Sequence, residues 1–542
     1  MKYLKDSRIY YIVIGLFVFL VYIRFAYPLP VMYADDSVKY SIPLQVIQAN
    51  FFNYILETPH FSFLAKYLAY FVQKANAGDI SFVIVIQKIS SILASLIVFL
   101  LSFEISKQRW LALILALVYG MNPQLLFIEQ LIMPESYFLF FGILASYLFY
   151  QLIKIDEVKR YSILAFFFSI SMVLAELSKE SGGIWSKAIL LTLFVIAIMT
   201  WKKTKKFSIV FLISITTVFL IKLPLCYYNY DKHKQFTVNR FDTSSGVLLW
   251  TLTEDFLRKG NLPNKHQWLS QALLALTNKN RKEFNLGPDA KDERSFFNAI
   301  STLNSAGRIG QLRNPITNKQ LSSKEWGQIC KEYWFEINFR NLGMALKRVF
   351  SYSGRRVLLE SNSNLHFFRR SSHPNVYIEA IPFTRSPFSL KSEFDSRLKN
   401  FRMVKINKLK ESDFEVFHPD HKNSPIKSNF VLMKDRGSEI GFLIPEKGLS
   451  LFLQSYLKYF PFAFFIIPFF IFALFKFIKD NSIGEFFRKT SSKYLFEFYL
   501  LGSIAVYFFL PILFSSGEPR YRLQFLSFMI IFIAYAFKKK SD

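Results

Sequence analysis

Apolar and polar stretches alternate along this chain on a length scale that fits a lipid bilayer. Apolar runs long enough, or nearly long enough, to cross a ~30 Å hydrocarbon core recur ten times. They occupy residues 9–27, 80–102, 110–121, 136–153, 161–178, 184–200, 207–225, 452–477, 495–514 and 522–537. The third run is short, so it either begins earlier or continues beyond Asn122-Pro123 as a broken helix. The pattern predicts a polytopic α-helical membrane protein with about ten transmembrane helices.

The composition agrees with a membrane protein. The 542 residues are 52% hydrophobic and 18% aromatic, which a soluble domain rarely tolerates. Lys2, Lys5 and Arg8 precede the first apolar run as in a signal peptide, but no clear small-x-small cleavage site follows, so we expect an uncleaved first helix. Cys226 and Cys330 are too few for a disulfide framework or a cysteine zinc site, and either one bridge or two free thiols is compatible with their predicted outer location.

The formal net charge of +28 would suggest a nucleic-acid ligand in a soluble protein. Here, however, the Lys and Arg residues fall mostly in short loops, which is the positive-inside pattern. With a cytoplasmic N-terminus, every basic cluster falls on the inner side, namely Lys107/Arg109, Lys154/Lys159/Arg160, Lys202/Lys203/Lys205/Lys206, Lys476/Lys479/Arg488/Lys489 and Lys538–Lys540. We therefore expect both termini in the cytoplasm, and no nucleic-acid partner.

The pattern divides the chain into three parts. Residues 1–225 form an N-terminal transmembrane core whose first external loop spans residues 28–79 and is expected to hold short interfacial helices or to act as a plain covering loop. Residues 226–451 are polar and are expected to form an external mixed α/β domain, inserted before the last three spans in residues 452–542. Within it, residues 325–350 have the spacing of an amphipathic helix lying on the outer membrane face.

Two adjacent carboxylates, Asp35 and Asp36, follow the first span directly. One Asp is a good helix N-cap before Ser-Val-Lys-Tyr, which is the alternative without a functional role. The second carboxylate adds repulsion without adding a second cap. A carboxylate pair at a membrane face can deprotonate an acceptor hydroxyl, with the other member binding a metal or orienting the base.

Three further polar groups lie at the ends of predicted external loops, where ionisable residues are costly. Glu135 in Met-Pro-Glu-Ser is either an ordinary helix-start residue or part of a site. Lys179 and Glu180 precede a Gly pair, and Lys179 either snorkels to the interface or meets a phosphate. Arg520 and Arg522 lie on the external side, against the charge rule, as interfacial anchors or as bidentate phosphate ligands.

With these residues laid out, the chain resembles the GT-C superfamily of integral-membrane glycosyltransferases. The closest group is similar to the dolichyl-phosphate-mannose protein mannosyltransferases and the bacterial lipid A aminoarabinose transferase. The resemblance covers residues 1–225 and 495–537. It rests on Asp35-Asp36 with Tyr40, Thr58-Pro59-His60, Asn122-Pro123 to Glu135, and Arg520-Tyr521. The Asp-Asp pair replaces the Asp-Glu of many members.

The resemblance implies an inverting glycosyltransferase that moves a sugar from a polyprenyl-phosphate donor to a lipid, glycan or protein acceptor at the external face of a bacterial inner or plasma membrane. Asp35 or Asp36 would be the catalytic base. Lys179, Arg520, Tyr521 and Arg522 would bind the donor phosphate, and Glu135, Glu180, Tyr40 and His60 are further candidates for acidic, metal or substrate contacts. Carboxylates of this kind suit a divalent cation such as Mg²⁺, Mn²⁺ or Zn²⁺, without requiring one.

Two other functions remain open at this point. A flippase or transporter of the same lipid carrier would share the spans and the phosphate contacts, but it would not need the Asp pair. A polysaccharide polymerase or ligase would use a lipid-pyrophosphate donor. No phosphate-binding Gly-rich loop, dinucleotide motif or nucleophile elbow occurs, so the energy for the reaction is expected to arrive in the lipid phase.

Overall fold

The computed structural model describes the chain in segments. These are residues 7–26, 31–32, 63–75, 82–129, 133–200, 205–233, 236, 238, 245–259, 265–283, 293–308, 310–348, 382–383, 401–405, 441–445, 462–480, 495–514 and 522–538. The chain divides into two compact units. Unit 1 comprises Met1–Pro224, Glu360–Tyr507 and Arg522–Asp542, and unit 2 comprises Leu225–Leu359 and Phe508–Tyr521.

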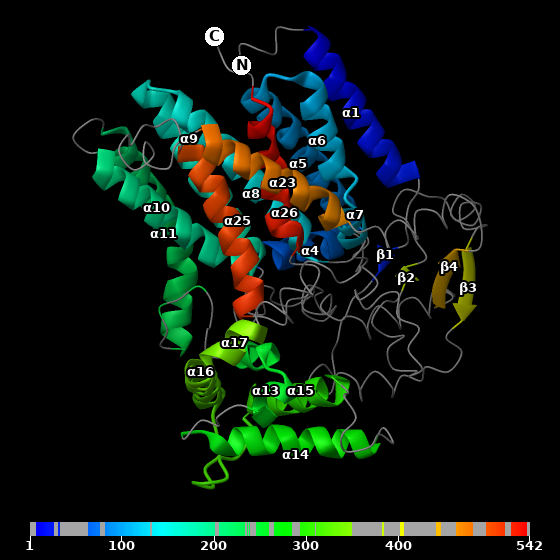
Figure 1. Ribbon diagram of the computed structural model, residues 1–542, viewed down its shortest axis with the longest axis vertical. Coiled ribbons are helices and arrows are strands. Elements are labelled where there is room, and N and C mark those ends of the chain that lie inside the picture. The colour runs from blue at the N-terminus through cyan, green and yellow to red at the C-terminus, as the bar shows by residue number, and fades with distance from the viewer. Residues whose placement is uncertain are drawn as a thin grey trace. The chain divides into compact units, whose positions relative to one another are not determined.

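Unit 1 is built mainly from apolar helices that run side by side (Figure 1). They are α1 (Ser7–Ala26), α4 (Phe63–Ala75), α5 (Phe82–Ser106), α6 (Arg109–Gly120), α7 (Pro123–Ile128), α8 (Glu135–Lys154), α9 (Val158–Ser178), α10 (Glu180–Thr200), α11 (Lys206–His233), α23 (Phe462–Asp480), α25 (Leu495–Phe514) and α26 (Arg522–Ala536). α11 and α25 continue into unit 2. Leu, Ile and Phe dominate these helices, because apolar side chains are favoured in a lipid environment. The helical form satisfies every backbone polar group within the segment.

The first three apolar runs pack closely on one another. α1, α5 and α6 share a buried cluster that includes Leu20, Ile92, Phe99 and Ala116. Gly120 ends α6 where a Cβ atom would lie only 2.8 Å from Leu20 Cδ2 and 2.9 Å from Ser95 Oγ. A larger residue at this position would force the Leu20 or Ser95 side chain to move, so glycine favours this close approach of the three helices.

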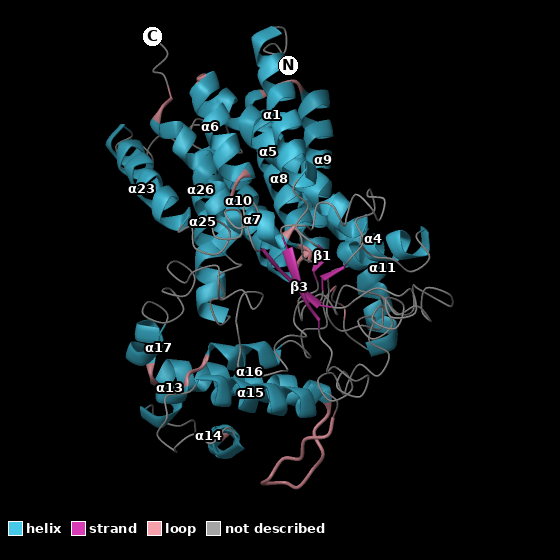
Figure 2. Ribbon diagram, turned by 90° about the vertical axis from the view of Figure 1, so that its right-hand side faces the viewer, coloured by secondary structure: helices cyan, strands magenta, loops and turns pink. Residues whose placement is uncertain are grey.

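The last helix of the chain lies inside unit 1. α26 packs against α5, α6, α8 and α23, and its described side chains from Leu523 to Ala534 are all buried (Figure 2). Aromatic rings connect it to its neighbours: Phe528 stacks on Tyr507 at 5.7 Å and lies 6.2 Å from Trp185. The C-terminal apolar run is thus a core element of the bundle.

Short antiparallel strands complete the described part of unit 1. β1 (Val31–Met32) pairs with β2 (Pro382–Phe383), and β3 (Phe401–Lys405) pairs with β4 (Gly441–Pro445) in the register Phe401 to Pro445. These strands occur within the segments that the sequence analysis assigned to external loops.

Five helices are long and apolar enough to cross a membrane, at Arg8–Phe25, Phe82–Ser106, Glu135–Lys154, Val158–Ser178 and Lys206–Lys232. Each coincides with a predicted span, so the protein is a helical integral membrane protein. Shorter apolar helices occur at Phe63–Val72, Arg109–Gly120, Gly183–Ile198, Leu495–Phe509 and Leu523–Ala536. The expected break of the third run is found: α6 ends, and α7 continues after Asn122, whose Oδ1 accepts a hydrogen bond from Gln124 N. The total of ten spans stays a prediction.

The described part of unit 2 between Ser245 and Arg348 is helical. It contains η3 (Ser245–Thr251), α13 (Glu254–Lys259), α14 (Gln267–Glu283), α15 (Glu293–Arg308), α16 (Ser323–Arg340) and α17 (Leu342–Arg348). Their shared core includes Leu269, Phe296, Trp326, Tyr333 and Ile337. Cys226 and Cys330 are both free thiols. A mixed α/β fold for residues 226–451 stays a prediction.

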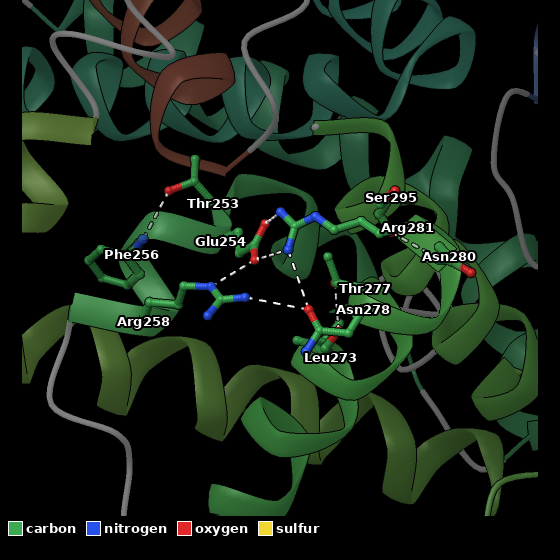
Figure 3. Close-up of polar contacts among 10 residues, drawn as sticks. All are labelled: Thr253, Glu254, Phe256, Arg258, Leu273, Thr277, Asn278, Asn280, Arg281 and Ser295. Carbon is green, nitrogen blue, oxygen red and sulfur yellow. Dashed lines mark hydrogen bonds and ion pairs between the residues drawn. The ribbon is translucent and has the colours of Figure 1, made fainter. Parts of the chain in front are cut away.

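Ion pairs hold the unit 2 helices in register. Figure 3 shows Arg258 and Arg281 converging on Glu254 and Asn278, so that α13 is tied to α14. Arg258 Nε donates to Glu254 Oε1 at 2.8 Å, and Arg281 Nη1 donates to the same oxygen at 2.8 Å. Because Arg281 is almost fully buried, its charge needs this carboxylate.

α16 begins with a capping box in which Ser322 Oγ accepts from Glu325 N and Ser322 N donates to Glu325.

Lys265, Gln328 and His266 all bind the Glu332 carboxylate, and these contacts lower the pKa of Glu332 to about 2. Burial lowers the pKa of Arg348, at the end of α17, to about 10.

Candidate active site at the Glu135 end of the bundle

Helices α8 to α11 run up and down in sequence, so their termini gather at two ends. We call these the Glu135 end and the Lys154 end, after the first and last residues of α8. α8 begins, α9 ends and α10 begins at the Glu135 end, where the predicted site residues Glu135, Lys179 and Glu180 lie. α9 packs against both α8 and α10, and Lys179 links α9 to α10.

Glu135 and Lys179 form an ion pair. Lys179 Nζ donates to Glu135 Oε1 at 2.8 Å, with the Glu135 side chain 2% exposed and the Lys179 side chain 13% exposed. Lys179 is extended at the C-cap of α9, where its N–H bonds Ala175 O, so its side chain turns away from the helix toward α8. Two residues from separate loops of the sequence, both named as site candidates, are thus brought into contact.

A second ion pair lies one turn further into the bundle. Glu176 Oε2 accepts from Ser186 Oγ at 2.7 Å and lies 2.6 Å from Lys222 Nζ on α11. The carboxylate is close against Gly183, because a Cβ there would meet Glu176 Oε1 at 3.2 Å. The missing side chain at Gly183 therefore makes room for the Glu176 carboxylate.

A third ion pair joins α1 to the loop after α7. Arg24 Nε lies 3.0 Å from Glu129 Oε1 and 3.1 Å from Oε2, and both side chains are fully buried. Arg24 Nη2 also donates to Gly120 O at 2.8 Å, and Lys88 Nζ donates to Arg24 O at 3.0 Å. Two cations and one carboxylate thus share this buried cluster, which places a surplus positive charge beside the last turn of α1.

Gln87 connects the third pair to the first. Its Nε2 donates to Glu129 O at 3.4 Å, and its Oε1 accepts from Met133 N at 3.2 Å, two residues before Glu135. Buried polar contacts at the Glu135 end therefore link α1, α5, the turn after α7, α8, α9 and α10, and they reach α11 at Lys222, within that helix. In a low-dielectric environment such contacts fix side chains firmly, as group-transfer chemistry requires.

The side chains of the remaining predicted site residues lie outside the described part of the structure. Glu180 and Arg522 begin α10 and α26, but their side chains lie outside the described part of the structure. The others, Asp35, Asp36, Tyr40, His60, Arg520 and Tyr521, lie outside the described residues altogether. Their roles stay predictions.

Three of the paired cations, Arg24, Lys88 and Lys222, are absent from the sequence-based candidates. The sequence does contain a signal for them, because each is an ionisable residue inside or at the end of an apolar run. Such residues are rare in spans and almost always face a partner within the bundle.

The described residues contain no group of three His, Cys, Asp or Glu side chains that could hold a metal ion. Glu135 pairs with Lys179, and Glu176 pairs with Lys222. A cation site built on Asp35 and Asp36 stays a prediction.

One comparison with known proteins matches a segment that contains part of this site. The model of the dolichyl-phosphate-mannose-protein mannosyltransferase family matches residues 72–240, which include both lysine–glutamate pairs, Glu135–Lys179 and Glu176–Lys222. The match covers less than a third of the chain. No curated protein matches this sequence.

Two solved structures resemble the chain, both of the archaeal oligosaccharyltransferase from Archaeoglobus fulgidus. The complex of AglB with an inhibitory peptide and a dolichol-phosphate has a TM-score of 0.44 and 14% identity over 98% of this chain. The apo form has a TM-score of 0.45 and 14% identity over 99% of this chain. The chain spans about half the length of these proteins, 50% and 51%.

Residues 72–240 thus resemble the dolichyl-phosphate-mannose-protein mannosyltransferase family. The resemblance expected from the sequence is confirmed over this segment. The three buried ion pairs lie within or directly against it.

Proposed function

We propose that the protein transfers a sugar from a polyprenyl-phosphate-linked donor to an acceptor at the outer membrane face, with inversion at the sugar carbon. The observation that carries this proposal is the family match over residues 72–240, which contains the Glu135–Lys179 pair. The family's name specifies a dolichyl-phosphate-mannose donor and a protein acceptor, so mannosyl transfer to protein is the first reaction to test. Other sugars, and lipid or glycan acceptors, come next.

In this proposal the Glu135 end holds the donor phosphate. A lipid phosphate is a good leaving group, and its departure requires neutralisation of negative charge more than a general acid. The Lys179 ammonium is a compact charge suited to a phosphate oxygen, and Glu135 holds it at the end of α8. Arg520, Tyr521 and Arg522, which precede and begin α26, are the further phosphate ligands we propose.

The acceptor hydroxyl needs a base, which we assign to Asp35 or Asp36. Both follow α1 within a short stretch of chain, and the last turn of α1 is fixed by the Arg24–Glu129 pair. One Asp would take the hydroxyl proton as the acceptor oxygen bonds to the sugar and the phosphate leaves. The other would orient the first.

The test is sugar transfer in membranes from a radiolabelled panel of polyprenyl-phosphate sugars, comparing the native sequence with Asp35→Asn and Asp36→Asn. Loss of a general base lowers the rate by about 10²–10⁴-fold. We expect one variant to show that loss while inserting normally, and the other to show less. Transfer undiminished in both variants, or no consumption of any lipid-phosphate donor, would overturn the proposal. Continued movement of the lipid carrier without sugar transfer would favour a flippase.

A further inference from the structure

A group of buried polar atoms near the Glu135 end has no hydrogen-bond partner within the described part of the chain. Gln524 Oε1 and Nε2 on α26 belong to this group, together with the Tyr507 hydroxyl on α25 and Glu135 Oε2 on α8. Gln524 and Tyr507 are 0% exposed, and Glu135 is 2% exposed. Unpaired polar atoms inside a protein are costly, so each of them requires an explanation.

Ring contacts and helix geometry bring these atoms to one place. The Tyr507 ring lies 5.4 Å from the Phe138 ring and 5.7 Å from the Phe528 ring. Glu135 precedes Phe138 by three residues on α8, a spacing that keeps both on one helical face. Gln524 precedes Phe528 by four residues on α26, with the same consequence. The unpaired atoms therefore border one aromatic cluster.

This aromatic cluster lies near the proposed phosphate site. α25 starts at the Lys154 end, where Phe496 lies 4.9 Å from Tyr150, so it runs toward the Glu135 end. α26 begins after a short link, and Gln524 is its third residue. Lys179 pairs with the other oxygen of Glu135 at 2.8 Å. Along the bundle axis, the unpaired atoms therefore lie within about two helical turns of the Lys179 ammonium.

The chemical character of the group indicates a neutral ligand that carries hydroxyl groups. An amide both donates and accepts hydrogen bonds, a phenol hydroxyl does the same, and a carboxylate oxygen accepts them. Sugar hydroxyls have the same dual capacity, and the C–H faces of a sugar ring pack well on aromatic rings. Such rings are present, because Trp185 also lies 6.1 Å from the Tyr507 ring. Aromatic walls with a few placed polar groups are typical of small-molecule sites.

We propose that Gln524, Tyr507 and Glu135 bind the sugar of the lipid-phosphate donor and determine which sugar is transferred. This inference rests on the proposed function, because the sugar is bonded to the phosphate that Lys179 would hold. The hydroxyls of a matching sugar supply the missing hydrogen bonds, whereas a sugar with hydroxyls elsewhere leaves the Gln524 amide unpaired. Because the polar atoms are fully buried, the surrounding side chains must move apart as the sugar enters.

The experiment measures equilibrium binding of two radiolabelled probes to the full chain in mixed micelles. One probe is the polyprenyl-phosphate sugar that the native protein transfers fastest, and the other is bare polyprenyl phosphate. The variants are Gln524→Leu and Tyr507→Phe, which remove polar atoms with little change in side-chain volume. The matched control is Tyr499→Phe on the same helix, because the Tyr499 hydroxyl already has a partner, Ser146 Oγ, at 3.1 Å. Unfolding by a denaturing detergent is recorded for every variant.

We expect Gln524→Leu and Tyr507→Phe each to weaken binding of the sugar-bearing probe by about tenfold or more, because a buried hydrogen bond to the sugar is lost. Binding of bare polyprenyl phosphate should stay within about twofold of native, and Tyr499→Phe should change the binding of neither probe by more than that. Gln524→Leu should also unfold at a higher detergent concentration than the native protein, because an unpaired buried amide has been removed.

Three outcomes would overturn the sugar site while leaving the proposed function intact. They are equal weakening of both probes, no weakening beyond that of Tyr499→Phe, and a Gln524→Leu protein that unfolds earlier than native, which would show a structural role for the amide. A native protein that transfers no sugar from the panel and binds neither probe would overturn the proposed function, and the sugar site with it.

Discussion

The ion-paired side chains at the two ends of the unit 1 helix bundle differ in how deeply they are buried. At the Glu135 end, Arg24 and Glu129 are fully buried, and the side chains of the two lysine–glutamate pairs are at most 15% exposed. At the Lys154 end, Lys154 pairs with Glu104 while 39% exposed, and Lys206 pairs with an Asp156 that is 97% exposed. Ion pairs at both ends involve α8 and α11.

The two kinds of ion pair differ in the desolvation free energy that forming them requires. Exposed pairs lose little hydration and contribute about 0–1 kcal/mol to the stability of the fold. Buried pairs lose their hydration, and replacing them with apolar side chains is often neutral or stabilising. The Glu135 end therefore keeps charges that stability alone does not require, which is the pattern expected where a charged headgroup must be bound.

The largest expected effect comes from removing the carboxylate of the buried cluster. Glu129→Gln leaves the charges of Arg24 and Lys88 buried without their counter-ion, which should destabilise the protein by about 3–5 kcal/mol. The matched control is Glu104→Gln at the Lys154 end, with an expected change of about 1 kcal/mol or less. Unfolding of the full chain in mixed micelles by a denaturing detergent measures both. Equal losses in the two variants would contradict the contrast between the ends.

A smaller effect is expected from filling the space beside Glu176. Gly183→Ala places a methyl 3.2 Å from Glu176 Oε1, so the Glu176–Lys222 pair must shift, at a cost of about 1 kcal/mol. Gly142→Ala is the control, because its new Cβ would only touch Phe528 at 3.8 Å and alanine favours the helix. The same unfolding measurement compares them, and a Gly183→Ala protein as stable as the control would show that the site is loosely packed.

The smallest effect is expected for the partly exposed Glu332 carboxylate in unit 2, which serves as a reference for ion pairs at the protein surface. Contacts with Lys265, Gln328 and His266 lower the pKa of Glu332 to about 2, so its ionised form stabilises the fold above the ordinary carboxyl pKa near 4.3. That stabilisation should be lost as the pH falls from about 4.5 through 2. Glu332→Gln should remove this part of the acid dependence in thermal unfolding of the full chain. An unchanged acid profile would show that the contacts of Glu332 are not maintained in solution.

Much of the helical architecture could be predicted from the sequence, because apolar runs of span length have few alternatives to a helix. The break at Asn122-Pro123 was predictable because the third apolar run is short and ends at a proline. The face that a helix buries in the protein could not be predicted from the sequence. Residues 325–350 were expected to form one amphipathic helix, but α16 directs Trp326, Tyr333 and Ile337 into protein, and Asn341 separates it from α17. Hydrophobic periodicity cannot distinguish burial in lipid from burial in a protein core.

The candidate site was predictable in its location but not in its contacts. Sidedness alone put Glu135 and Lys179 at the same end of the bundle. The partners of Glu176 and Glu129, however, are 46 and 105 residues away in sequence and depend on the rotation of α11 and α1. No local pattern encodes that rotation.

The most direct test of the account compares one lysine from each end in the same transfer assay. Lys179→Met should lower sugar transfer from a polyprenyl-phosphate donor on the order of 10²-fold, because a cation at the leaving phosphate is lost. Lys154→Met, at the opposite end, should stay within about threefold of the native rate. That result would place phosphate neutralisation at the Glu135 end. Equal rates in the two variants, both close to native, would contradict the central claim.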